Sequence, residues 1–274
     1  MKTIAVIFIV PLLLIQSCKD NSNPSIPVSE NFVYPLKIGN EWTYNTSTRF
    51  VNITPDSIKY LLIDRETKFR VLVKRDTVLN SHPVFELMQS IPDEMDTYGY
   101  YANEDTGFIK YGYRNGQGGI LWKPVRTKFL YKDNYYDNIS ELIGKFEDGG
   151  ILQKPSLDDI IILEEPLIIY PYPLYTGKEW SAHNPIFGLT KKVVGQVIVS
   201  TPAGYYLCYK IRWNYLKSDG TVDYNTSYFE YINQKGLLKK VMTFKNITIT
   251  TAENPDGIGS ADVEYEAVAE DINF

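Results

Sequence analysis

The stretch Pro35-Leu36-Lys37-Ile38-Gly39-Asn40-Glu41-Trp42 has a second copy later in the chain, Pro173-Leu174-Tyr175-Thr176-Gly177-Lys178-Glu179-Trp180. Both copies read Pro-Leu-x-x-Gly-x-Glu-Trp with the same spacing. A glycine phrase follows each copy, first Thr106-Gly107-Phe108-Ile109-Lys110 and then Lys235-Gly236-Leu237-Leu238-Lys239. The recurrence of both phrases in the same order predicts two similar halves that arose by internal duplication. In each half a tight turn at glycine precedes a strand anchored by a large aromatic residue.

The composition favours strands. The chain has 22 Tyr, 12 Phe and 4 Trp, with 44% hydrophobic residues overall, and aromatic and β-branched residues suit pleated sheets. Apolar and polar residues alternate in Phe69–Lys74 and in Tyr205–Tyr215, which is the period of a half-buried strand. Asp219-Gly220 is a hairpin signal. The sequence therefore predicts a mainly β protein of curved antiparallel sheets in two similar halves, with at most one or two short helices.

The middle of the chain has a different sequence pattern, which includes a helical one. Ile139, Leu142, Ile143 and Phe146 have helical spacing and predict a short helix within 137–146. Two short strands are expected at 160–163 and 167–170, and an acidic last strand at 262–272 is expected at a sheet edge. The expected organisation is a signal peptide at 1–17, a lipidated cysteine and linker at 18–30, a first β-rich half at 31–131, a connector with the helix at 132–165, and a second β-rich half at 166–274.

The N-terminus has the anatomy of a signal peptide. Lys2 supplies a positive charge, an apolar run extends from Ile4 to Ile15, and this run is too short to span a bilayer. Ile15-Gln16-Ser17-Cys18 closes the run and resembles a bacterial lipobox, although Gln16 is larger than the usual residue at that position. We expect cleavage before Cys18 and acylation of its thiol with fatty acids such as palmitate. The alternative is an ordinary cleaved signal with an incidental cysteine.

A lipid anchor has physical consequences for the rest of the chain. Each buried CH₂ of an acyl chain contributes roughly 0.8 kcal/mol, so several chains on Cys18 would hold the protein to a membrane durably. The polar run 19–25 would serve as a solvated, flexible linker between the anchor and the fold. If Cys18 is lipidated, Cys208 has no disulfide partner and the fold is held by packing alone. The net charge of −5 makes a nucleic-acid partner unfavourable.

The phrase Pro35-Leu36-x-x-Gly39-Asn40-x-Trp42-x-Tyr44 resembles one found near the mature N-terminus of many uncharacterised lipoproteins of Gram-negative bacteria. The later phrase 235–239 is similar to the closing motif of such chains, and the resemblance covers about two-thirds of the sequence. It implies an exported, β-rich envelope protein with the curved half-barrel seen in carriers of lipidated proteins. We expect the lipid anchor of this protein to lie in the outer membrane. The resemblance implies no reaction, and it assigns structural roles to the motif residues Gly39, Trp42, Tyr44, Gly107, Gly177, Trp180 and Gly236.

No catalytic constellation or cofactor motif is evident. His82 and His183 each stand alone in predicted loops, so neither a zinc site nor a catalytic histidine is expected. Three acidic clusters would suit a carboxylate-pair hydrolase only if two of them faced one another. These clusters are Asp93-Glu94-x-Asp96, Asp158-Asp159 and Glu164-Glu165. A calcium loop around Asn254–Gly257, with Asp262 and Glu264, lacks the spacing of a known motif. We expect no metal and no cofactor.

The sequence leaves the roles of one cysteine and of three aromatic residues open. Cys208 lies two residues from Lys210, which would lower its thiol pKa if the two groups approached, but a small residue filling a sheet face is the simpler interpretation. Tyr205, Tyr206 and Trp213 could line a groove for sugars or acyl chains, or could belong to the sheet core. The leading prediction is a non-enzymatic envelope lipoprotein that binds or scaffolds an unknown protein or ligand. The alternatives are a carrier of glycans or lipids and a hydrolase with a carboxylate pair.

Overall fold

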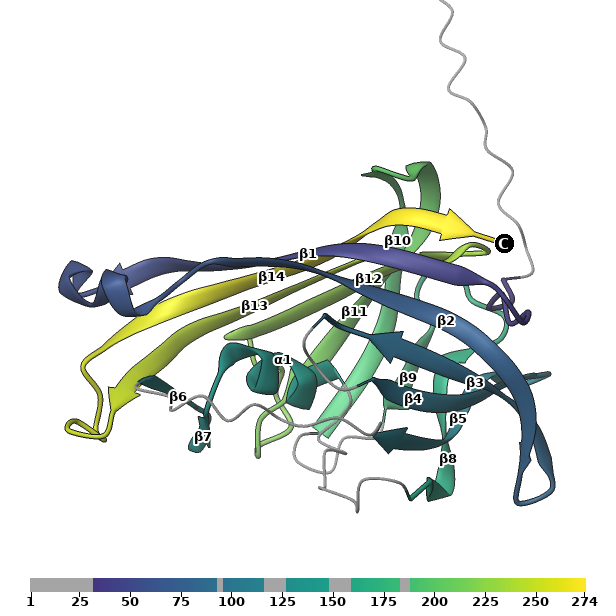
Figure 1. Cartoon of the computed structure of the whole chain (residues 1–274), viewed down its shortest axis with the longest axis horizontal. Helices are drawn as coiled ribbons and strands as arrows, with labels where there is room; N and C mark the ends of the chain where they lie inside the picture. Colours follow the sequence, from purple (N-terminus) through teal and green to yellow (C-terminus); the bar gives the residue numbers. More distant parts are fainter. Residues whose placement is uncertain (1–31, 93–95, 116–126, 148–158, 183–187) are drawn as a thin grey trace, which may run out of the picture.

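The computed structural model describes residues 32–92, 96–115, 127–147, 159–182 and 188–274. They form one strongly curved antiparallel sheet that arches over the helix α1 (Figure 1). Up to the helix, the elements are β1 (Glu41–Thr54), the 3₁₀ helix η1 (Asp56–Leu61), β2 (Arg65–Leu79), β3 (His82–Ser90), β4 (Thr97–Glu104), β5 (Gly107–Asn115), β6 (Thr127–Tyr131), β7 (Asn134–Tyr136) and α1 (Ile139–Glu147). After it come β8 (Ile161–Pro171), β9 (Glu179–Ala182), β10 (Gly188–Thr201), β11 (Gly204–Leu216), β12 (Thr226–Asn233), β13 (Gly236–Thr251) and β14 (Gly259–Asn273).

The sheet consists of two successive meanders. The spatial order is β8-β5-β4-β3-β2-β1-β14-β13-β12-β11-β10-β9, and β6 pairs with β13 and β7 beside this path. The first meander contains β1 to β5 and β8, and the second contains β9 to β14. The first strand of one, β1, pairs with the last strand of the other, β14. The predicted fold class is confirmed, and the described residues contain two short helices, η1 and α1.

Both copies of the tryptophan phrase form the same local structure. Gly39 and Gly177 each have φ of +93°. The Gly39 N–H donates to the Val73 carbonyl over 2.9 Å, and the Gly177 N–H donates to the Val193 carbonyl over 2.8 Å. Each valine also precedes a register shift, between β2 and β3 in the first meander and between β10 and β11 in the second. The two phrases are therefore alike in backbone geometry as well as in letters, while their origin by duplication stays a prediction.

The glycine phrases also occupy matching places. Gly107 begins β5 and Gly236 begins β13, each the fifth strand of its meander and each after a tight hairpin turn. A side chain at Gly107 would lie 2.4 Å from the Tyr170 carbonyl oxygen, and one at Gly236 would lie 2.9 Å from the Trp42 indole nitrogen. A neighbouring group therefore lies so close to the backbone at both positions that only glycine fits there without a clash.

The main core fills the concave side of the sheet. Trp42, Tyr44 and Phe69 belong to it. Every second residue of β11 to β14 also points into it, as the two-residue period of a strand requires. The helix α1 packs Leu142, Ile143 and Phe146 into the same core, which confirms the predicted helix and its apolar stripe. The Tyr215 hydroxyl donates to the Phe146 carbonyl over 2.7 Å and ties the helix to β11.

The two ends of the sheet approach each other near the start of the described chain. The Phe32 ring lies edge-on to Tyr170 of β8 and to Tyr209 of β11, with centroid distances of 6.1 and 6.3 Å. The Tyr34 ring stacks on Phe108 of β5 at 4.1 Å. Residues 32–34 therefore fill the space between the two ends and contribute to the inner wall.

Two sequence predictions need correction. The acidic last strand was expected at an edge, but β14 lies between β1 and β13 in the middle of the sheet. Its acids point outward and meet cations on β13, which is adjacent, and on β2, which lies beyond β1, as in the Lys239–Glu266 and Lys68–Glu270 ion pairs. The two short strands expected at 160–163 and 167–170 are one strand, β8, which spans the expected domain boundary at 165–166 and pairs with β5.

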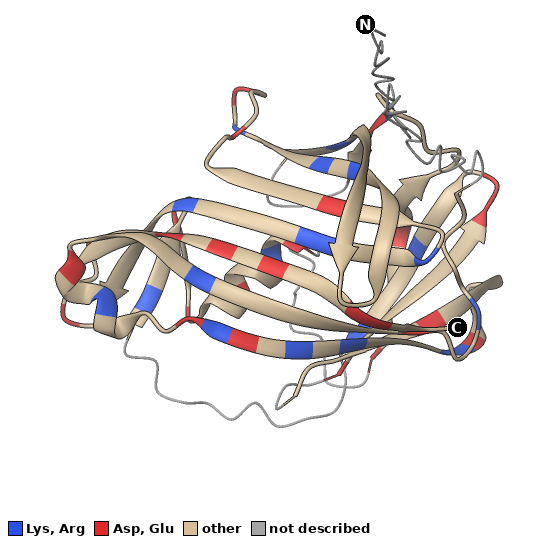
Figure 2. Cartoon of the chain, turned by 90° about the horizontal axis from the view of Figure 1, so that it is seen from above, with Lys and Arg blue, Asp and Glu red and all other residues tan. Residues whose placement is uncertain are grey.

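Charges of both signs are interspersed along the strands when the sheet is seen from above (Figure 2). Such a surface has no large field of one sign to attract a polyanion. No helix in the described part of the chain is long and apolar enough to cross a membrane.

Candidate functional site

The predicted structural residues lie in the core or at turns. Trp42 and Tyr44 are buried. The Trp42 indole N–H donates to the Lys235 carbonyl over 2.6 Å, and the Tyr44 hydroxyl donates to the Leu237 carbonyl over 2.8 Å. Trp180 is only half-buried. Cys18, the predicted lipidation site, lies outside the described residues.

The structure does not bring the three predicted stacking aromatics together. Tyr205 is 81% exposed. Tyr206 donates its hydroxyl hydrogen to the Ala203 carbonyl within its own turn, over 2.7 Å. Trp213 alone lines a cavity, and both faces of its ring are occupied. Tyr228 stacks on it at 4.2 Å, and the Lys191 Nζ lies 3.6 Å from its centroid.

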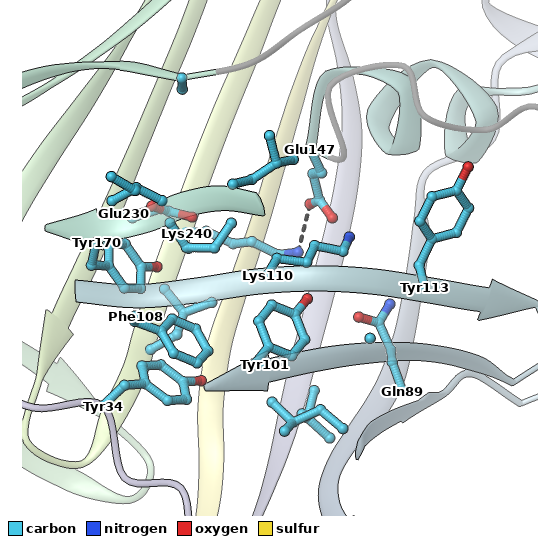
Figure 3. A pocket seen from close by; sticks show the side chains of 18 of the residues that line it. Tyr34, Gln89, Tyr101, Phe108, Lys110, Tyr113, Glu147, Tyr170, Glu230 and Lys240 are labelled. Atoms are coloured by element: carbon cyan, nitrogen blue, oxygen red, sulfur yellow. Dashed lines mark ion pairs between the residues drawn. The ribbon is translucent and has the colours of Figure 1, made fainter. Parts of the chain in front are cut away.

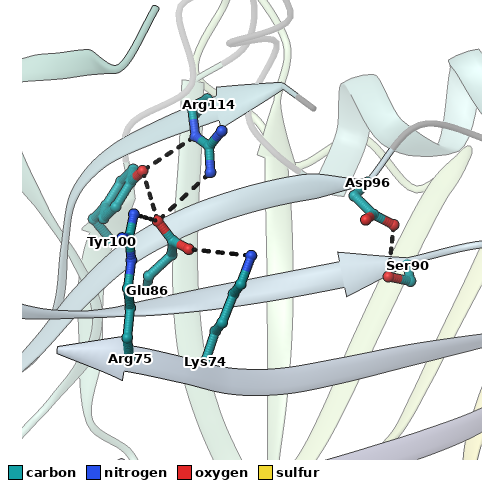
Figure 4. Close-up of polar contacts among 7 residues, drawn as sticks. All are labelled: Lys74, Arg75, Glu86, Ser90, Asp96, Tyr100 and Arg114. Carbon is teal, nitrogen blue, oxygen red and sulfur yellow. Dashed lines mark hydrogen bonds and ion pairs between the residues drawn. The ribbon is translucent and has the colours of Figure 1, made fainter. Parts of the chain in front are cut away.

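The other sequence candidates are dispersed. His82 is exposed at the start of β3, and Asp96 accepts a hydrogen bond from the Ser90 hydroxyl over 2.6 Å (Figure 4). Asp262 accepts from the Asn52 amide and the Asn246 N–H. His183, Asp93, Glu94 and Asp158 lie outside the described residues. Within the described ranges no three His, Cys, Asp or Glu side chains are grouped so as to hold a metal.

Cys208 is a buried thiol rather than a reactive one. It is 1% exposed, and desolvation raises its pKa to about 12. A thiol becomes nucleophilic as the thiolate, so this environment suppresses its reactivity at neutral pH. The interpretation of Cys208 as a small residue packed in the sheet is the one that the structure favours.

A cavity of about 260 Å³ lies on the concave side and draws its walls from both meanders (Figure 3). This volume is near the lower end of the range of about 300–1,000 Å³ that is usual for small-molecule sites. Tyrosines, other aromatics and aliphatic side chains form much of the wall, with Gln89 and Thr97 among the neutral polar groups. Its described charged lining residues are Lys110, Arg114, Glu147, Lys191, Glu230 and Lys240.

Four of these charged residues come from the second meander and the helix. Lys191 of β10 and Glu230 of β12 are 3% and 6% exposed, and the Lys191 Nζ lies 4.0 Å from the Glu230 Oε2. Lys240 of β13 forms an ion pair of 2.5 Å with Glu147 at the end of α1. Lysines and glutamates therefore alternate across the inner wall, where burial penalises each charge.

Burial also changes the protonation of these groups. Desolvation lowers the pKa of Lys191 to about 8, although the Glu230 carboxylate opposes this shift. For Lys240, desolvation acts in the same direction, but Glu147 and other anionic neighbours outweigh it and raise the pKa above its ordinary value. Desolvation, together with the charge of Glu230, raises the pKa of Tyr170 and Tyr228 well above the usual range. Both phenols are therefore neutral hydrogen-bond donors at any physiological pH.

Apart from the Glu147 Oε1, which forms the ion pair with Lys240, two buried polar atoms of this wall have no hydrogen-bond partner among the described residues. One is the Glu230 Oε2, which can only accept when ionised, and the other is the Trp213 Nε1, which can only donate. The second Glu230 oxygen accepts from the Tyr228 hydroxyl over 3.2 Å. At 4.0 Å, the Lys191 Nζ is too distant for a hydrogen bond to Glu230. Among the described residues, a donor (the Trp213 Nε1) and an acceptor (the Glu230 Oε2) of the cavity wall are thus both left without a hydrogen bond.

The charged cavity residues were not singled out from the sequence, although a signal was present. Lys191, Glu230 and Lys240 each interrupt an alternating apolar face, between Leu189 and Val193, Tyr228 and Ile232, and Leu238 and Met242. A charge at an inward position of a strand is costly, so each interruption marks a candidate site residue. Their proximity, however, depends on the strand pairing and on where the helix packs.

A second hollow of about 580 Å³ lies across β1, β2 and β14. Its lining is mostly exposed or half-buried, and the Lys68–Glu270 ion pair crosses it. Among the described residues, no buried polar atom without a partner belongs to this hollow. The concave cavity is therefore the better candidate for a ligand site.

Neither a family model nor a curated protein matches the chain. A "putative lipoprotein" from Parabacteroides distasonis ATCC 8503 is 12% identical over 89% of this chain and 99% of that one, with a TM-score of 0.37. A "putative exported protein with YmcC-like fold" from Bacteroides fragilis NCTC 9343 is 13% identical over 89% of this chain and 100% of that one, with a TM-score of 0.31. At TM-scores this low, the two likenesses support no conclusion about the function of this chain.

Proposed function

We propose that the protein is an exported envelope lipoprotein, anchored in the outer membrane through acyl chains on Cys18, and that its sheet binds a small polar ligand. Support for the anchor comes from the positive Lys2, the apolar run 4–15 and the lipobox-like Ile15-Gln16-Ser17-Cys18. Support for binding comes from the concave cavity and its buried charges.

The observation that carries the binding proposal is the unmatched pair in the cavity wall. An unpaired buried donor or acceptor costs about 1–3 kcal/mol, and more when it is charged. The Glu230 Oε2 and the Trp213 Nε1 are two buried atoms of this kind that no described protein group satisfies. A fold gains nothing from such groups unless something else satisfies them, and strongly perturbed buried ionisable groups cluster at functional sites. A polar ligand would supply the missing partners.

The same wall disfavours two of the alternative functions. An acyl chain would surround Lys191, Glu230 and Lys240 with hydrocarbon that offers them no polar partner, so a lipid carrier is the poorer fit. A hydrolase with a carboxylate pair needs one protonated acid to donate to the leaving group. The Lys240 ammonium, 2.5 Å from Glu147, favours the ionised form of that carboxylate instead.

The anchor can be tested by metabolic labelling with radioactive palmitate. We expect the label in the parent protein and none in Cys18→Ala, with the mature chain beginning at Cys18. An unlabelled parent, or a mature N-terminus at another residue, would contradict the anchor and leave the cavity proposal standing.

The cavity can be tested by a thermal-shift screen of polar and apolar small molecules, followed by titration calorimetry. We expect at least one polar compound to bind, and Glu230→Gln to weaken it at least about tenfold, which corresponds to about 1.4 kcal/mol. The matched control is Glu266→Gln, which removes a half-buried carboxylate from the outer face of β14. Binding of apolar chains alone, or equal effects of the two substitutions, would contradict the proposal.

A further inference from the structure

We infer that the ligand of this cavity is a neutral sugar, and that Lys191, Trp213 and Glu230 bind its adjacent hydroxyl groups. The inference rests on the proposed binding function and names its ligand class. It begins from the three side chains that face one another where β10, β11 and β12 lie side by side.

The hydrogen-bonding capacity of the three groups selects the chemistry. The Lys191 ammonium and the Trp213 N–H only donate, whereas a carboxylate oxygen such as the Glu230 Oε2 only accepts. A ligand carboxylate satisfies the two donors but repels Glu230, and a ligand amine satisfies Glu230 but not the donors. A hydroxyl group does both, because its hydrogen can be donated to Glu230 while its oxygen accepts from lysine or indole.

The spacing fits this arrangement. The Lys191 Nζ and the Glu230 Oε2 are 4.0 Å apart, which exceeds a direct hydrogen bond. An oxygen atom about 2.8 Å from each of them would bridge the two. A hydroxyl on the neighbouring carbon would then accept from the Trp213 N–H. A zwitterionic amino acid would also match both signs, but its ammonium would have to sit beside that of Lys191 in a poorly hydrated site.

The sequence suggested that the face of Trp213 stacks on a ligand, and the structure changes this role. Tyr228 stacks on the ring and the Lys191 Nζ lies over it, so the N–H, which is buried without an acceptor among the described residues, is the group that lacks a partner. The apolar faces of a sugar ring would instead meet the other aromatic and aliphatic walls of the cavity. The volume of about 260 Å³ suits one sugar unit rather than a long chain.

The test is titration calorimetry of the full acylated chain in detergent with three sets of compounds. These are neutral monosaccharides and their methyl glycosides, the corresponding deoxy sugars, and a control set of amino acids and simple carboxylates. We expect at least one neutral sugar to bind. Removal of either of two adjacent hydroxyls should weaken it at least about tenfold, since each removal leaves a buried polar group of the wall without its partner.

Two substitutions assign the subsite. We expect Trp213→Phe and Glu230→Gln each to weaken the bound sugar at least about tenfold. The matched control is Trp180→Phe, because the Trp180 Nε1 is also buried without a partner, yet Trp180 does not line the cavity among its described residues. This control should leave the affinity for the sugar unchanged. If Trp213→Phe fails to fold, the deoxy-sugar series on the parent protein and Glu230→Gln carry the test.

The outcomes separate this inference from the proposal beneath it. If an amino acid or carboxylate binds with dependence on Glu230 and no sugar does, the polar site stands and the sugar inference is wrong. If a sugar binds but neither Trp213→Phe nor Glu230→Gln affects it, the assigned subsite is wrong. If no polar compound binds, both the inference and the cavity proposal fail.

Discussion

The indole N–H of Trp42 donates a hydrogen bond to the main-chain carbonyl of Lys235 over 2.6 Å, although 193 residues separate them. Trp42 belongs to the first tryptophan phrase, and Lys235 opens the second glycine phrase. The next residue, Gly236, has φ of +90° and passes directly over the indole ring. This contact links the two meanders next to the seam formed by β1 and β14.

Gly236→Ala should destabilise the fold strongly. The new Cβ would lie 2.9 Å from the Trp42 Nε1 and 3.1 Å from two ring carbons, in a backbone conformation that L side chains rarely adopt. We expect a loss of about 2–4 kcal/mol in the free energy of unfolding, measured by urea denaturation. The matched control is Gly220→Ala, which has φ of +79° but open space around the new methyl group. Equal losses in the two variants would show that the indole contact contributes nothing.

Trp42→Phe should cost more than the same change at Trp180. It removes the donor to the Lys235 carbonyl and leaves a cavity, because Trp42 is completely buried. Trp180 is half-buried and has no hydrogen-bond acceptor among the described residues. We expect the loss at Trp42 to exceed the loss at Trp180 by about 2 kcal/mol or more, measured by urea denaturation. A larger loss at Trp180 would refute the assignment of Trp42 as the principal anchor.

These contacts indicate what the sequence could and could not reveal about the fold. The repeated phrases and the alternation in β11 predicted the strands, because inward and outward positions of a strand differ by one residue. The order of the strands in the sheet could not be predicted from the sequence in the same way. The acids of β14 suggested an edge, since Glu266 has no cationic neighbour in sequence, and the Lys239 that balances it comes from the adjacent strand β13.

A second polar cluster lies on β2 to β5 and shares Arg114 with the lining of the cavity (Figure 4). The buried Glu86 carboxylate accepts hydrogen bonds from Arg75 over 2.9 Å and from the Tyr100 hydroxyl over 3.0 Å. The guanidinium of Arg114 lies 3.6 Å from the same carboxylate, and the Lys74 ammonium 4.0 Å from its other oxygen. One buried carboxylate therefore holds three cations together.

Glu86→Gln should destabilise the protein because it leaves these cations without their counter-ion. We expect a loss of about 2 kcal/mol or more in the free energy of unfolding at low salt. The control is Glu41→Gln, which breaks the more exposed pair with Arg70 and should cost no more than about 1 kcal/mol. If both variants lost the same amount, burial of Glu86 would not be what makes its interactions strong.

For the candidate site, as for the fold, the sequence predicted which positions point inward but not which residues lie next to one another. Trp213 was singled out for its ring, but Tyr228 and Lys191 already contact that ring, and the group without a partner among the described residues is its buried N–H. Lys191 and Glu230 occupy inward positions of their strands, which the alternation places correctly. That they face each other follows from pairing of β11 with both β10 and β12, and no local pattern encodes this.

Lys191 makes the stability of the protein depend on pH in a defined direction. Desolvation lowers its pKa from 10.5 to about 8 in the folded state. Between these two values the unfolded chain binds the proton and the folded chain does not, so the free energy of unfolding rises with pH. Below about pH 8 both states are protonated, and the folded state bears the full cost of the buried charge. The slope within the window is at most about 1.4 kcal/mol per pH unit.

The measurement compares the parent with Lys191→Met by urea denaturation from pH 7 to 9.5. Titration of the many tyrosines is common to both proteins and cancels in the difference. We expect the parent to gain stability relative to Lys191→Met by about 1–2 kcal/mol between pH 8 and 9.5. Lys192→Met, one residue along on the exposed side of β10, should keep the pH dependence of the parent. A difference between parent and Lys191→Met that stays constant with pH would mean that Lys191 remains charged in the folded state, well hydrated or fully paired with Glu230.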